Sequence, residues 1–399
     1  MSEWQKVKLK DCCIKIGSGS TPKGGSMVYV NSGTSLIRSQ NVYNLSFDYN
    51  GLTHITEDAA NKLKGVTVFN EDILLNITGD SVARTCIVPK EVLPARVNQH
   101  VAIIRTDRKK MNWRFLNYYL ASPKMQAHML SLAVGKGASR NAITKQMIEN
   151  FEVPYPPLST QHCIANILSR YDSLIENYQK QIKLLEEAAQ RLYKEWFIDL
   201  RFPGHENTKI VDGVPEGWEK KRLIDLVDVQ YGYAFDGKLF NSSGEGMPIL
   251  RIRNIPDGIT SDYTTEEAQD CYIVHNGDIV VGMDGIFHIN SWSGGDAYLV
   301  QRACSFRPKE ECMKGFIFQA IQEPIKFFEK TLVGATVAHL GKKHIDSIEL
   351  CIPKNFELYK PFSKFYNQRQ GLLSQIRLLT EARDRLLPKL MSGEINVES

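Results

Sequence analysis

The chain repeats its own sequence once along its length, and this duplication constrains the fold more than any other feature. The segment Trp4–Asp11 returns as Trp218–Asp225, and Leu36–Asn41 returns as Ile249–Asn254. Further matching words occur in the same order, while the offset between them falls slowly from 214 to 194 residues. Words that keep their order with a drifting offset are typical of a diverged tandem duplication. Two similar domains are therefore expected.

Each copy is predicted to contain an α+β domain followed by a long helix. The first ~150 residues of each copy mix short β-branched and aromatic runs with Gly, Asn and Asp turns, which favours short strands and short helices. After Pro157 no Gly or Pro occurs until Pro203, and Ser159 or Thr160 is a suitable N-cap. This stretch predicts a helix of about 40 residues, roughly 60 Å long.

Apolar residues recur along the first helix at alternating steps of four and three, which is the heptad pattern of a coiled-coil seam. The second copy carries the same pattern, interrupted by Arg369 and Arg383. Pairing the two helices within one chain would satisfy both seams. The predicted seam consists of Tyr171, Ile175, Tyr178, Ile182, Leu185, Ala189, Leu192 and Trp196 in the first helix, and of Phe365, Leu372, Ile376, Leu379, Leu386 and Leu390 in the second.

The repeat, the helices and a Pro- and Gly-rich linker divide the chain into six parts. The predicted domains span residues 1–157 and 218–354, each followed by its helix at 158–199 and 355–392. The linker covers residues 200–217, and a short tail covers 393–399.

Composition indicates a globular protein of the reducing cytoplasm. With 399 residues the chain is longer than a domain built around a single hydrophobic core usually is. No apolar run approaches the ~20 residues of a membrane span, and the first residues lack the apolar core of a signal peptide. The 8 cysteines include no Cys-x-x-Cys spacing, so neither a disulfide framework nor a thiolate zinc site is expected.

The two predicted domains differ in charge. Residues 1–157 hold 20 lysines and arginines against 12 aspartates and glutamates, a net charge of +8. Residues 218–354 hold 15 against 19, a net charge of −4. The basic first domain suggests a polyanionic partner, whereas the acidic second domain argues against blanket binding of nucleic acid.

Several segments resemble the specificity subunits of type I restriction-modification enzymes. They match the opening of a target-recognition domain and the entries and exits of the conserved spacer helices in that family, in the right order. Thr160 departs from the family's pattern, where an acidic residue precedes the glutamine. The matching segments are Val214–Glu219, Pro156–Gln161 with Ile164–Leu168, Trp196–His205 and Leu386–Ile395.

This resemblance implies a fold and a role. The fold would be α+β, with two target-recognition domains related by internal duplication and separated by two long helices pairing as an antiparallel coiled coil. The chain would read a split, asymmetric sequence in double-stranded DNA. It would scaffold two adenine-N6 DNA methyltransferase subunits and the restriction (translocase) subunits. S-adenosylmethionine, ATP and Mg²⁺ would then bind to those partners, and the chain itself would hold no cofactor.

No catalytic centre is expected in the chain itself. A methyltransferase needs a glycine-rich cofactor turn after a strand and an Asn/Asp-Pro-Pro-aromatic stretch, which Gly17–Gly19 and Tyr155–Leu158 do not supply. The phosphate-binding loop and the acid-x-Lys spacing of nucleases are also absent, and the histidines show no metal-ligand spacing. Two alternatives stay open: a coiled-coil protein–protein adaptor without DNA readout, and a degenerate adenine-N6 DNA methyltransferase.

Candidate DNA-reading residues lie in polar, loop-like stretches that carry Arg, Asn and Gln, whose bidentate geometry distinguishes bases in the major groove. The segment Lys136–Asn141 is the strongest candidate because it combines glycine with two cations and no large apolar residue. The first-domain candidates are Lys23, Arg38, Gln40, Asn41, Thr78, Arg84, Gln99, His100, Lys136, Ser139, Arg140 and Asn141. The second-domain candidates are Tyr231, Tyr233, Arg251, Arg253, Asn254, His288, Asn290, Gln301, Arg302, His339, Lys342 and Lys343.

Overall fold

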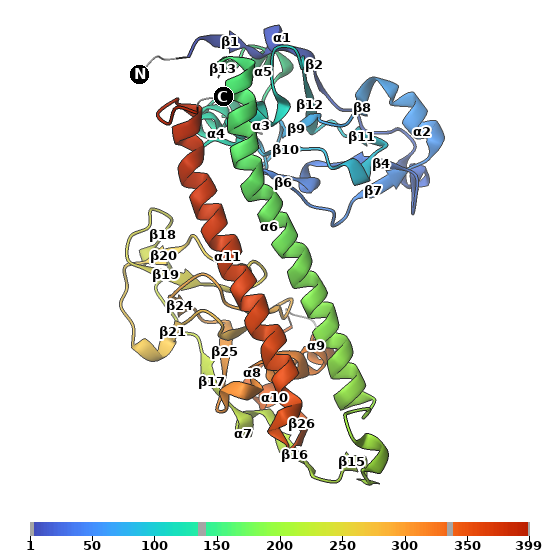
Figure 1. The fold of residues 1–399 in the computed structure, drawn as a ribbon, viewed down its shortest axis with the longest axis vertical. Helices are drawn as coiled ribbons and strands as arrows, with labels where there is room; N and C mark the ends of the chain where they lie inside the picture. Colours follow the sequence, from blue (N-terminus) through green and yellow to red (C-terminus); the bar gives the residue numbers. More distant parts are fainter. Residues whose placement is uncertain (1–3, 135–140, 333–337, 398–399) are drawn as a thin grey trace. The chain divides into compact units, whose positions relative to one another are not determined.

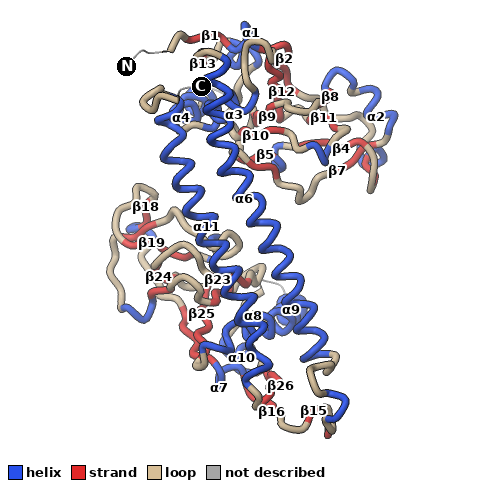
Figure 2. The backbone as a smooth tube through the Cα atoms, viewed as in Figure 1, coloured by secondary structure: helices blue, strands red, loops and turns tan. Residues whose placement is uncertain are grey.

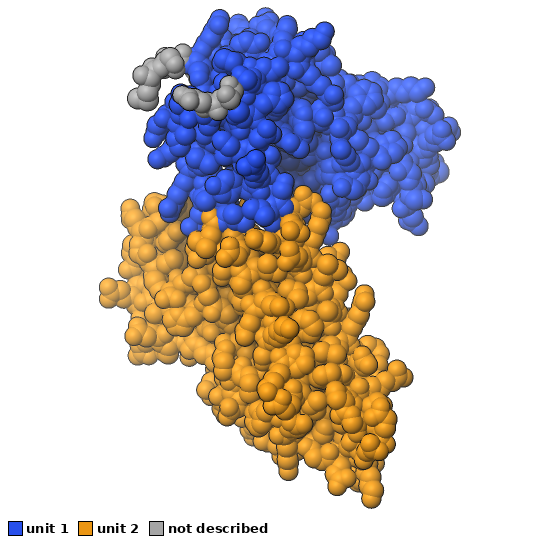
Figure 3. All heavy atoms as spheres, in the orientation of Figure 1, with its two compact units in different colours: residues 1–174, 379–399 blue, residues 175–378 orange. Residues whose placement is uncertain are grey.

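The computed structural model describes residues 4–134, 141–332 and 338–397. The chain forms two compact units, the first made of residues 1–174 and 379–399 and the second of residues 175–378 (Figure 3). Each unit combines one α+β domain with part of each of two long helices, α6 (Leu158–Tyr193) and α11 (Lys360–Met391) (Figure 1). The predicted mixture of helix and sheet is therefore confirmed.

The domain of the first unit contains a four-stranded and a five-stranded sheet (Figure 2). The four-stranded sheet has the order β10 (Thr85–Ile87), β9 (Ile73–Asn76), β12 (Val101–Thr106), β2 (Cys13–Ser18). The five-stranded sheet has the order β3 (Tyr29–Val30), β7 (Thr53–Ile55), β4 (Thr34–Ile37), β11 (Ala95–Val97), β8 (Thr67–Val68). Strands β4 and β11 are parallel, and the other pairs are antiparallel.

Short elements complete the first domain and close its ends. Strand β1 (Lys6–Lys8) pairs with β13 (Glu152–Pro154), so the start and end of the domain meet. A hairpin joins β5 (Val42–Tyr43) and β6 (Ser46–Phe47). The helices are α1 (Leu9–Cys12), α2 (Glu57–Lys62), α3 (Trp113–Ala121), α4 (Pro123–Ala133) and α5 (Lys145–Glu149).

The domain of the second unit repeats the strand order of both main sheets, which confirms the duplication. Its four-stranded sheet has the order β17 (Val227–Tyr231), β25 (Ala303–Pro308), β22 (Ile279–Gly282), β23 (Ile289–Ser291). Its five-stranded sheet has the order β18 (Phe240–Asn241), β20 (Tyr263–Thr264), β19 (Met247–Leu250), β24 (Ala297–Leu299), β21 (Ile273–Val274). Strand β16 (Trp218–Arg222) pairs with β26 (Glu349–Pro353) as β1 pairs with β13.

The remaining elements of the second unit are short. Its helices are α7 (Leu223–Leu226), α8 (Lys314–Ala320), α9 (Gln322–Thr331) and α10 (Lys342–Asp346). A hairpin of β14 (Ile210–Val211) and β15 (Val214–Pro215) lies within the predicted linker.

Each domain packs its main core against the long helices. In the first unit, Leu168 of α6 and Leu390 of α11 share a core with Phe115 of α3. In the second unit, Leu192 of α6 packs against the core that holds Phe362 of α11. The early part of α6 thus meets the late part of α11, and the late part of α6 meets the early part of α11. The two helices are antiparallel.

The structure places the predicted seam on the packed face of the helices but corrects it near the end of the first helix. Trp196 is half-buried, whereas Phe197, one residue later, is 7% exposed. The cause is a π-helical turn at Lys194–Ile198, in which the Asp199 amide bonds the Lys194 carbonyl at 2.8 Å. Such a turn inserts an additional residue into the helix and rotates the residues after it, so the heptad phase is lost there.

The start of the second helix also differs from the prediction. Helix α11 begins at Lys360 rather than at residue 355, because residues Phe356–Tyr359 form a 3₁₀ turn. The side chains buried in its first half are Phe362, Tyr366 and Arg369, whereas the predicted Phe365 is half-buried. Arg369 and Arg383 do not interrupt the seam, because both face the partner helix and form ion pairs with it.

Candidate nucleic-acid interface

In the first domain, four loops meet at the end of the four-stranded sheet. Backbone hydrogen bonds fix them: the Gly19 amide donates to the Val101 carbonyl at 2.9 Å, and the Ile77 amide to the His100 carbonyl at 2.9 Å. The Gly79 amide donates to the Asn141 carbonyl at 3.1 Å. We call the polar side chains on these loops loop cluster 1, consisting of Thr21, Thr78, Gln99, His100 and Asn141.

Four side chains of loop cluster 1, those of Thr21, Gln99, His100 and Thr78, form a connected set of hydrogen-bonding groups. The Thr21 hydroxyl donates to Gln99 Oε1 at 2.9 Å, and Gln99 Nε2 lies 3.4 Å from His100 Nε2. The other ring nitrogen of His100, Nδ1, lies 2.6 Å from the Thr78 hydroxyl. Gln99 is exposed and His100 is half-buried. The chain of contacts therefore positions an amide and an imidazole at the surface. The Gln99 amide keeps an N–H and an oxygen lone pair for a ligand, whereas both ring nitrogens of His100 are engaged within the cluster.

The second domain builds the same backbone arrangement from the equivalent residues. The Gly232 amide donates to the Ala303 carbonyl at 3.0 Å, the Met283 amide to the Arg302 carbonyl at 2.8 Å, and the Gly285 amide to the Ala338 carbonyl at 3.0 Å. These three bonds correspond one by one to those of the first domain. The duplication thus extends from the sheets to the loops.

We call the side chains on these loops loop cluster 2, consisting of Tyr233, Asp284, Gln301, Arg302 and His339. Asp284 Oδ1 lies 2.5 Å from His339 Nδ1, and its other oxygen lies 3.4 Å from Arg302 Nε. Tyr233 packs against Tyr272 with ring centroids 5.1 Å apart. Gln301 and Gln99 occupy equivalent positions, but the remaining side chains differ between the clusters.

One glycine in each domain makes the arrangement possible. A Cβ atom on Gly19 would lie 2.2 Å from the carbonyl oxygen of Asn98, and one on Gly232 would lie 2.1 Å from that of Val300. No side chain tolerates such an approach to backbone, so both positions require glycine. Gly19 belongs to the segment Gly17–Gly19, which was compared above with the glycine-rich cofactor turn of a methyltransferase. Its role in the structure is to let two loops touch.

The structure brings together eight of the predicted residues and assigns several others elsewhere. The residues that join the two clusters are Thr78, Gln99, His100, Asn141, Tyr233, Gln301, Arg302 and His339. His288 lies in the same loop as Asp284, and its carbonyl accepts from Gly282. Lys23, Lys342 and Lys343 are exposed near the ends of the cluster loops in sequence. Lys136, Ser139 and Arg140 lie outside the described residues.

Two predicted asparagines serve the fold instead. Asn41 is buried, its Oδ1 accepts from the Arg38 amide at 3.0 Å and its Nδ2 donates to the Asp48 carbonyl at 2.9 Å. Asn254 accepts from the Arg251 amide in the same way. Both side chains cap a local turn, so the Oδ1 atom of each is engaged with backbone. In both copies of the repeat, an asparagine that follows an arginine by three residues indicates this capped turn.

Other predicted residues also have partners within their own domain. Arg38 and Gln40 both donate to the Gly51 carbonyl. Arg84 stacks on the ring of Tyr43, and Arg251 stacks on Phe240. Arg253 pairs with Asp262 at 2.5 Å. Tyr231 is half-buried on strand β17, where burial raises the pKa of its phenol to about 12. Asn290 accepts from Arg369 at 2.8 Å.

Sequence reasoning missed Asp284, which links two residues of loop cluster 2. The signal was available, because Asp72–Leu74 matches Asp278–Val280, and the same offset places Asp284 opposite Thr78. Comparing polar residues at equivalent positions would have selected it. Among the described residues, no group of three or more His, Cys, Asp or Glu side chains is arranged to hold a metal ion. No described helix has the length and apolar character needed to cross a membrane.

The duplicated domain matches a known family twice. The family model of the type I restriction modification DNA specificity domain matches residues 1–187 and again residues 215–377. The chain belongs to this family. As a DNA specificity subunit it corresponds to the interpretation drawn from its sequence motifs, rather than to the adaptor or methyltransferase alternatives.

Relatives of this specificity subunit extend over nearly its whole length. It is 26% identical to the type I restriction enzyme MjaIX specificity subunit of Methanocaldococcus jannaschii, covering 99% of this chain and 94% of the relative. It is 26% identical to the MjaVIII specificity subunit of the same organism, covering 84% of this chain and 82% of the relative. The crystal structure of an S subunit from M. genitalium has the same fold, with a TM-score of 0.56 at 15% identity, covering 99% of this chain and 97% of that chain.

Proposed function

We propose that loop clusters 1 and 2 are the DNA-reading surfaces of the two recognition domains, each reading one half of a split, asymmetric sequence. The observation that carries this proposal is that one backbone arrangement occurs twice with different side chains. Cluster 1 offers Gln99, His100 and Thr78, whereas cluster 2 offers Gln301, Arg302 and His339 beside Asp284. A common frame that displays different donors and acceptors is suited to two different half-sites.

The chemistry of the side chains fits base recognition. A glutamine amide can bond adenine through N6 and N7, and an arginine can bond guanine through O6 and N7. Gln99, Gln301 and Arg302 are all exposed and able to make such contacts. Asp284 contacts both Arg302 and His339 and so positions the two side chains relative to each other. Since domain 1 carries a net charge of +8 and domain 2 of −4, domain 1 supplies most phosphate contacts and most of the salt dependence.

We further propose that the paired helices bind the methyltransferase subunits, which bring S-adenosylmethionine, and that restriction subunits with ATP and Mg²⁺ join this core. In the second unit the helices expose Leu184 to 65% and Leu378 to 50%. A groove beside them is lined by Gln181, Leu185 and Leu372. The described lining of this groove contains leucine and glutamine but no charged side chain, and depletion of charge is typical of the core of a protein–protein interface.

Methylation mapping of DNA from cells that carry the subunit with its methyltransferase partner tests the reading surfaces. Replacing Gln99 and His100 by alanine should relax or abolish one half-site and leave the other unchanged. Replacing Gln301 and Arg302 should affect the other half-site. The expected loss is roughly 10- to 100-fold for each bidentate contact removed. The matched control is Asn61→Ala with Lys62→Ala on α2, outside the cluster, which should change neither half-site. Two unaltered half-sites in both cluster variants would contradict the proposal.

A further inference from the structure

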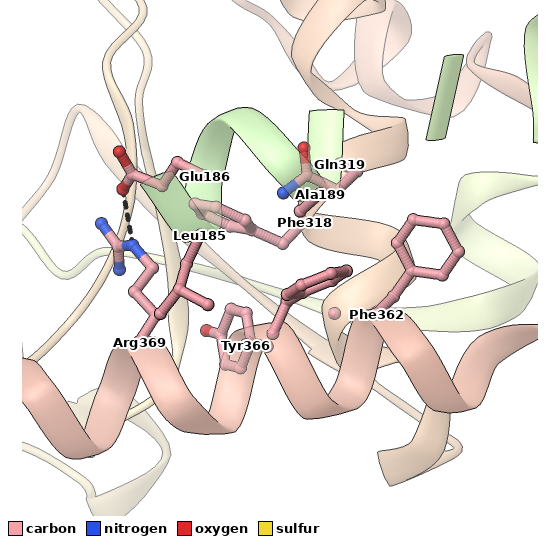
Figure 4. Close-up of a pocket in the computed structure, with 10 residues that line it drawn as sticks. Leu185, Glu186, Ala189, Phe318, Gln319, Phe362, Tyr366 and Arg369 are labelled. Atoms are coloured by element: carbon pink, nitrogen blue, oxygen red, sulfur yellow. Dashed lines mark hydrogen bonds and ion pairs between the residues drawn. The ribbon is translucent and has the colours of Figure 1, made fainter. Parts of the chain in front are cut away.

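Two ion pairs lie on the seam between the long helices. In the first unit Arg383 of α11 lies 2.7 Å from Asp172 of α6, and in the second unit Arg369 of α11 lies 2.6 Å from Glu186 of α6. Figure 4 shows the latter pair at the edge of an apolar pocket. The arginine side chains are only 14% and 10% exposed, so they are largely shielded from water, whereas the carboxylates of Asp172 and Glu186 are 29% and 37% exposed.

Each ion pair is also anchored to the recognition domain of its own unit. The Tyr118 hydroxyl of α3 donates to Asp172. Arg369 donates to the Asn290 side chain at 2.8 Å and to the Ser291 hydroxyl, both on β23. Asp172 and Arg369 are therefore held from two sides, which keeps both charges at the seam when the partner across it is absent. Their geometry therefore demands an opposite charge across the seam.

The charges break the symmetry that the duplication gives the helices. The segment Gln181–Leu185 returns as Gln375–Leu379, which fixes the equivalent positions of the two helices. Both acids stand on α6 and both arginines on α11. Their equivalents on the other helix are uncharged: Asp172 corresponds to Tyr366, Glu186 to Thr380, Arg369 to Ile175 and Arg383 to Ala189.

Pairing between like helices would leave these charges unmatched. In the register set by the two ion pairs, a second copy of α6 would place Ala189 opposite Asp172 and Ile175 opposite Glu186. Two copies of α11 would place Thr380 opposite Arg369 and Tyr366 opposite Arg383. Arg383 would keep its contact with Asp384 on its own helix, but the other three residues would lose their seam partners. An unmatched, shielded charge is strongly destabilising.

We infer that the seam is a specificity surface whose matching partner is the opposite helix: α6 pairs with α11 and rejects a second copy of itself. The two ion pairs favour pairing of α6 with α11. They disfavour the pairing of two α6 helices, or of two α11 helices, from different copies of this chain. This inference concerns the assembly of the chain alone and does not depend on DNA reading.

The substitution Gln181→Cys reports on pairing between copies of α6. Gln181 is exposed beside the seam and lies next to the midpoint between Asp172 and Ala189, where two antiparallel copies of α6 would meet. A disulfide between the introduced thiols of two chains, which we call the α6–α6 crosslink, therefore forms only when like helices pair. Exchange of α11 between two chains would keep each introduced thiol opposite α11 and would give no such crosslink.

The experiment compares full-length proteins that carry Gln181→Cys, refolded at high concentration and oxidised. The natural seam should give monomer without the α6–α6 crosslink. The variant Asp172→Tyr, Glu186→Thr, Arg369→Ile and Arg383→Ala, which gives each position the residue of its equivalent, should give roughly tenfold more crosslinked dimer or greater. The control Glu187→Gln with Arg191→Gln removes an exposed ion pair from α6 and should behave like the natural seam.

Light scattering and peptide mapping of the disulfide decide the outcome, with proteins lacking Gln181→Cys as the background for the natural cysteines. An α6–α6 crosslink formed by the natural seam overturns the inference. The inference is also overturned if the fourfold variant folds but yields no more crosslinked dimer than the natural seam. If the fourfold variant does not fold, the two pairs are removed separately, and each folded twofold variant must still exceed the control.

Discussion

Truncation of Phe197 tests the packing of the second unit most directly. Its ring is 7% exposed and lies within 4.7 Å of Phe316, 5.2 Å of Trp218, 5.3 Å of Tyr193 and 5.5 Å of Phe362, measured between ring centroids. Phe197→Ala should cost about 3–5 kcal/mol of unfolding free energy, because the cavity lies among fixed rings that cannot collapse to fill it.

The neighbouring residues supply matched controls. Trp196 is half-buried and has one ring contact, with Phe362 at 6.0 Å, so Trp196→Ala should cost less than Phe197→Ala despite the larger side chain. Ile198 is 58% exposed, and Ile198→Ala should change the unfolding free energy by no more than about 0.5 kcal/mol.

Calorimetry and urea titration, followed by tryptophan fluorescence, measure these differences. For a unit of residues 175–378, a loss of 3–5 kcal/mol corresponds to a fall in Tm of roughly 6–20 °C. A fall below about 2 °C for Phe197→Ala, or a larger fall for Trp196→Ala, would refute the assignment of the π-helical turn as the point where the helix changes its buried face.

Two further outcomes are expected from the structure. Gly232→Ala should displace the loops of cluster 2 because its Cβ would meet the Val300 carbonyl at 2.1 Å; methylation mapping should show loss at one half-site, whereas Gly237→Ala, which meets open space, should leave both intact. Burial raises the pKa of Tyr193 and of Tyr231 to about 12, against an ordinary value near 10. The folded state therefore retains protons that the unfolded state releases, and stability should be complete below pH 10 and decline between pH 10 and 12. Denaturant titration at each pH, with phenolate absorbance, would show this; a stability independent of pH across that window would count against it.

Much of the fold could be predicted because the duplication and the heptad pattern can both be recognised from short stretches of sequence. Matching words identified equivalent strands, and the spacing of apolar residues identified the packed face of α6. The π-helical turn could not be foreseen, since a strict heptad count assumes an unbroken helix up to Trp196. Arg369 and Arg383 were misread as interruptions because their partners, Glu186 and Asp172, lie 183 and 211 residues away in sequence.

The candidate site was predicted less completely for a related reason. Side-chain type alone suggested Asn41 and Asn254, yet their local capping bonds, which depend on backbone geometry, engage both. Gln99 and Gln301 were identified because they lie at equivalent positions beside apolar strands. Asp284 escaped notice because the candidates were chosen from polar stretches that carry Arg, Asn and Gln, whereas its position equivalent to Thr78 and its contacts with His339 and Arg302 give it a place in the cluster.

The composition of the first unit has a consequence for the order in which the protein matures. Leu387, Leu390 and Met391 belong to the same core as Leu9 and Phe115, whereas the second unit is the continuous stretch 175–378. A ribosome adds about 5–20 residues per second, so roughly 10–40 s pass between the synthesis of residue 174 and of Leu387. The domain that is synthesised first is thus the one whose core closes last. During that interval the core lacks Leu387, Leu390 and Met391, and chaperone demand should be concentrated on the surface that these residues later cover.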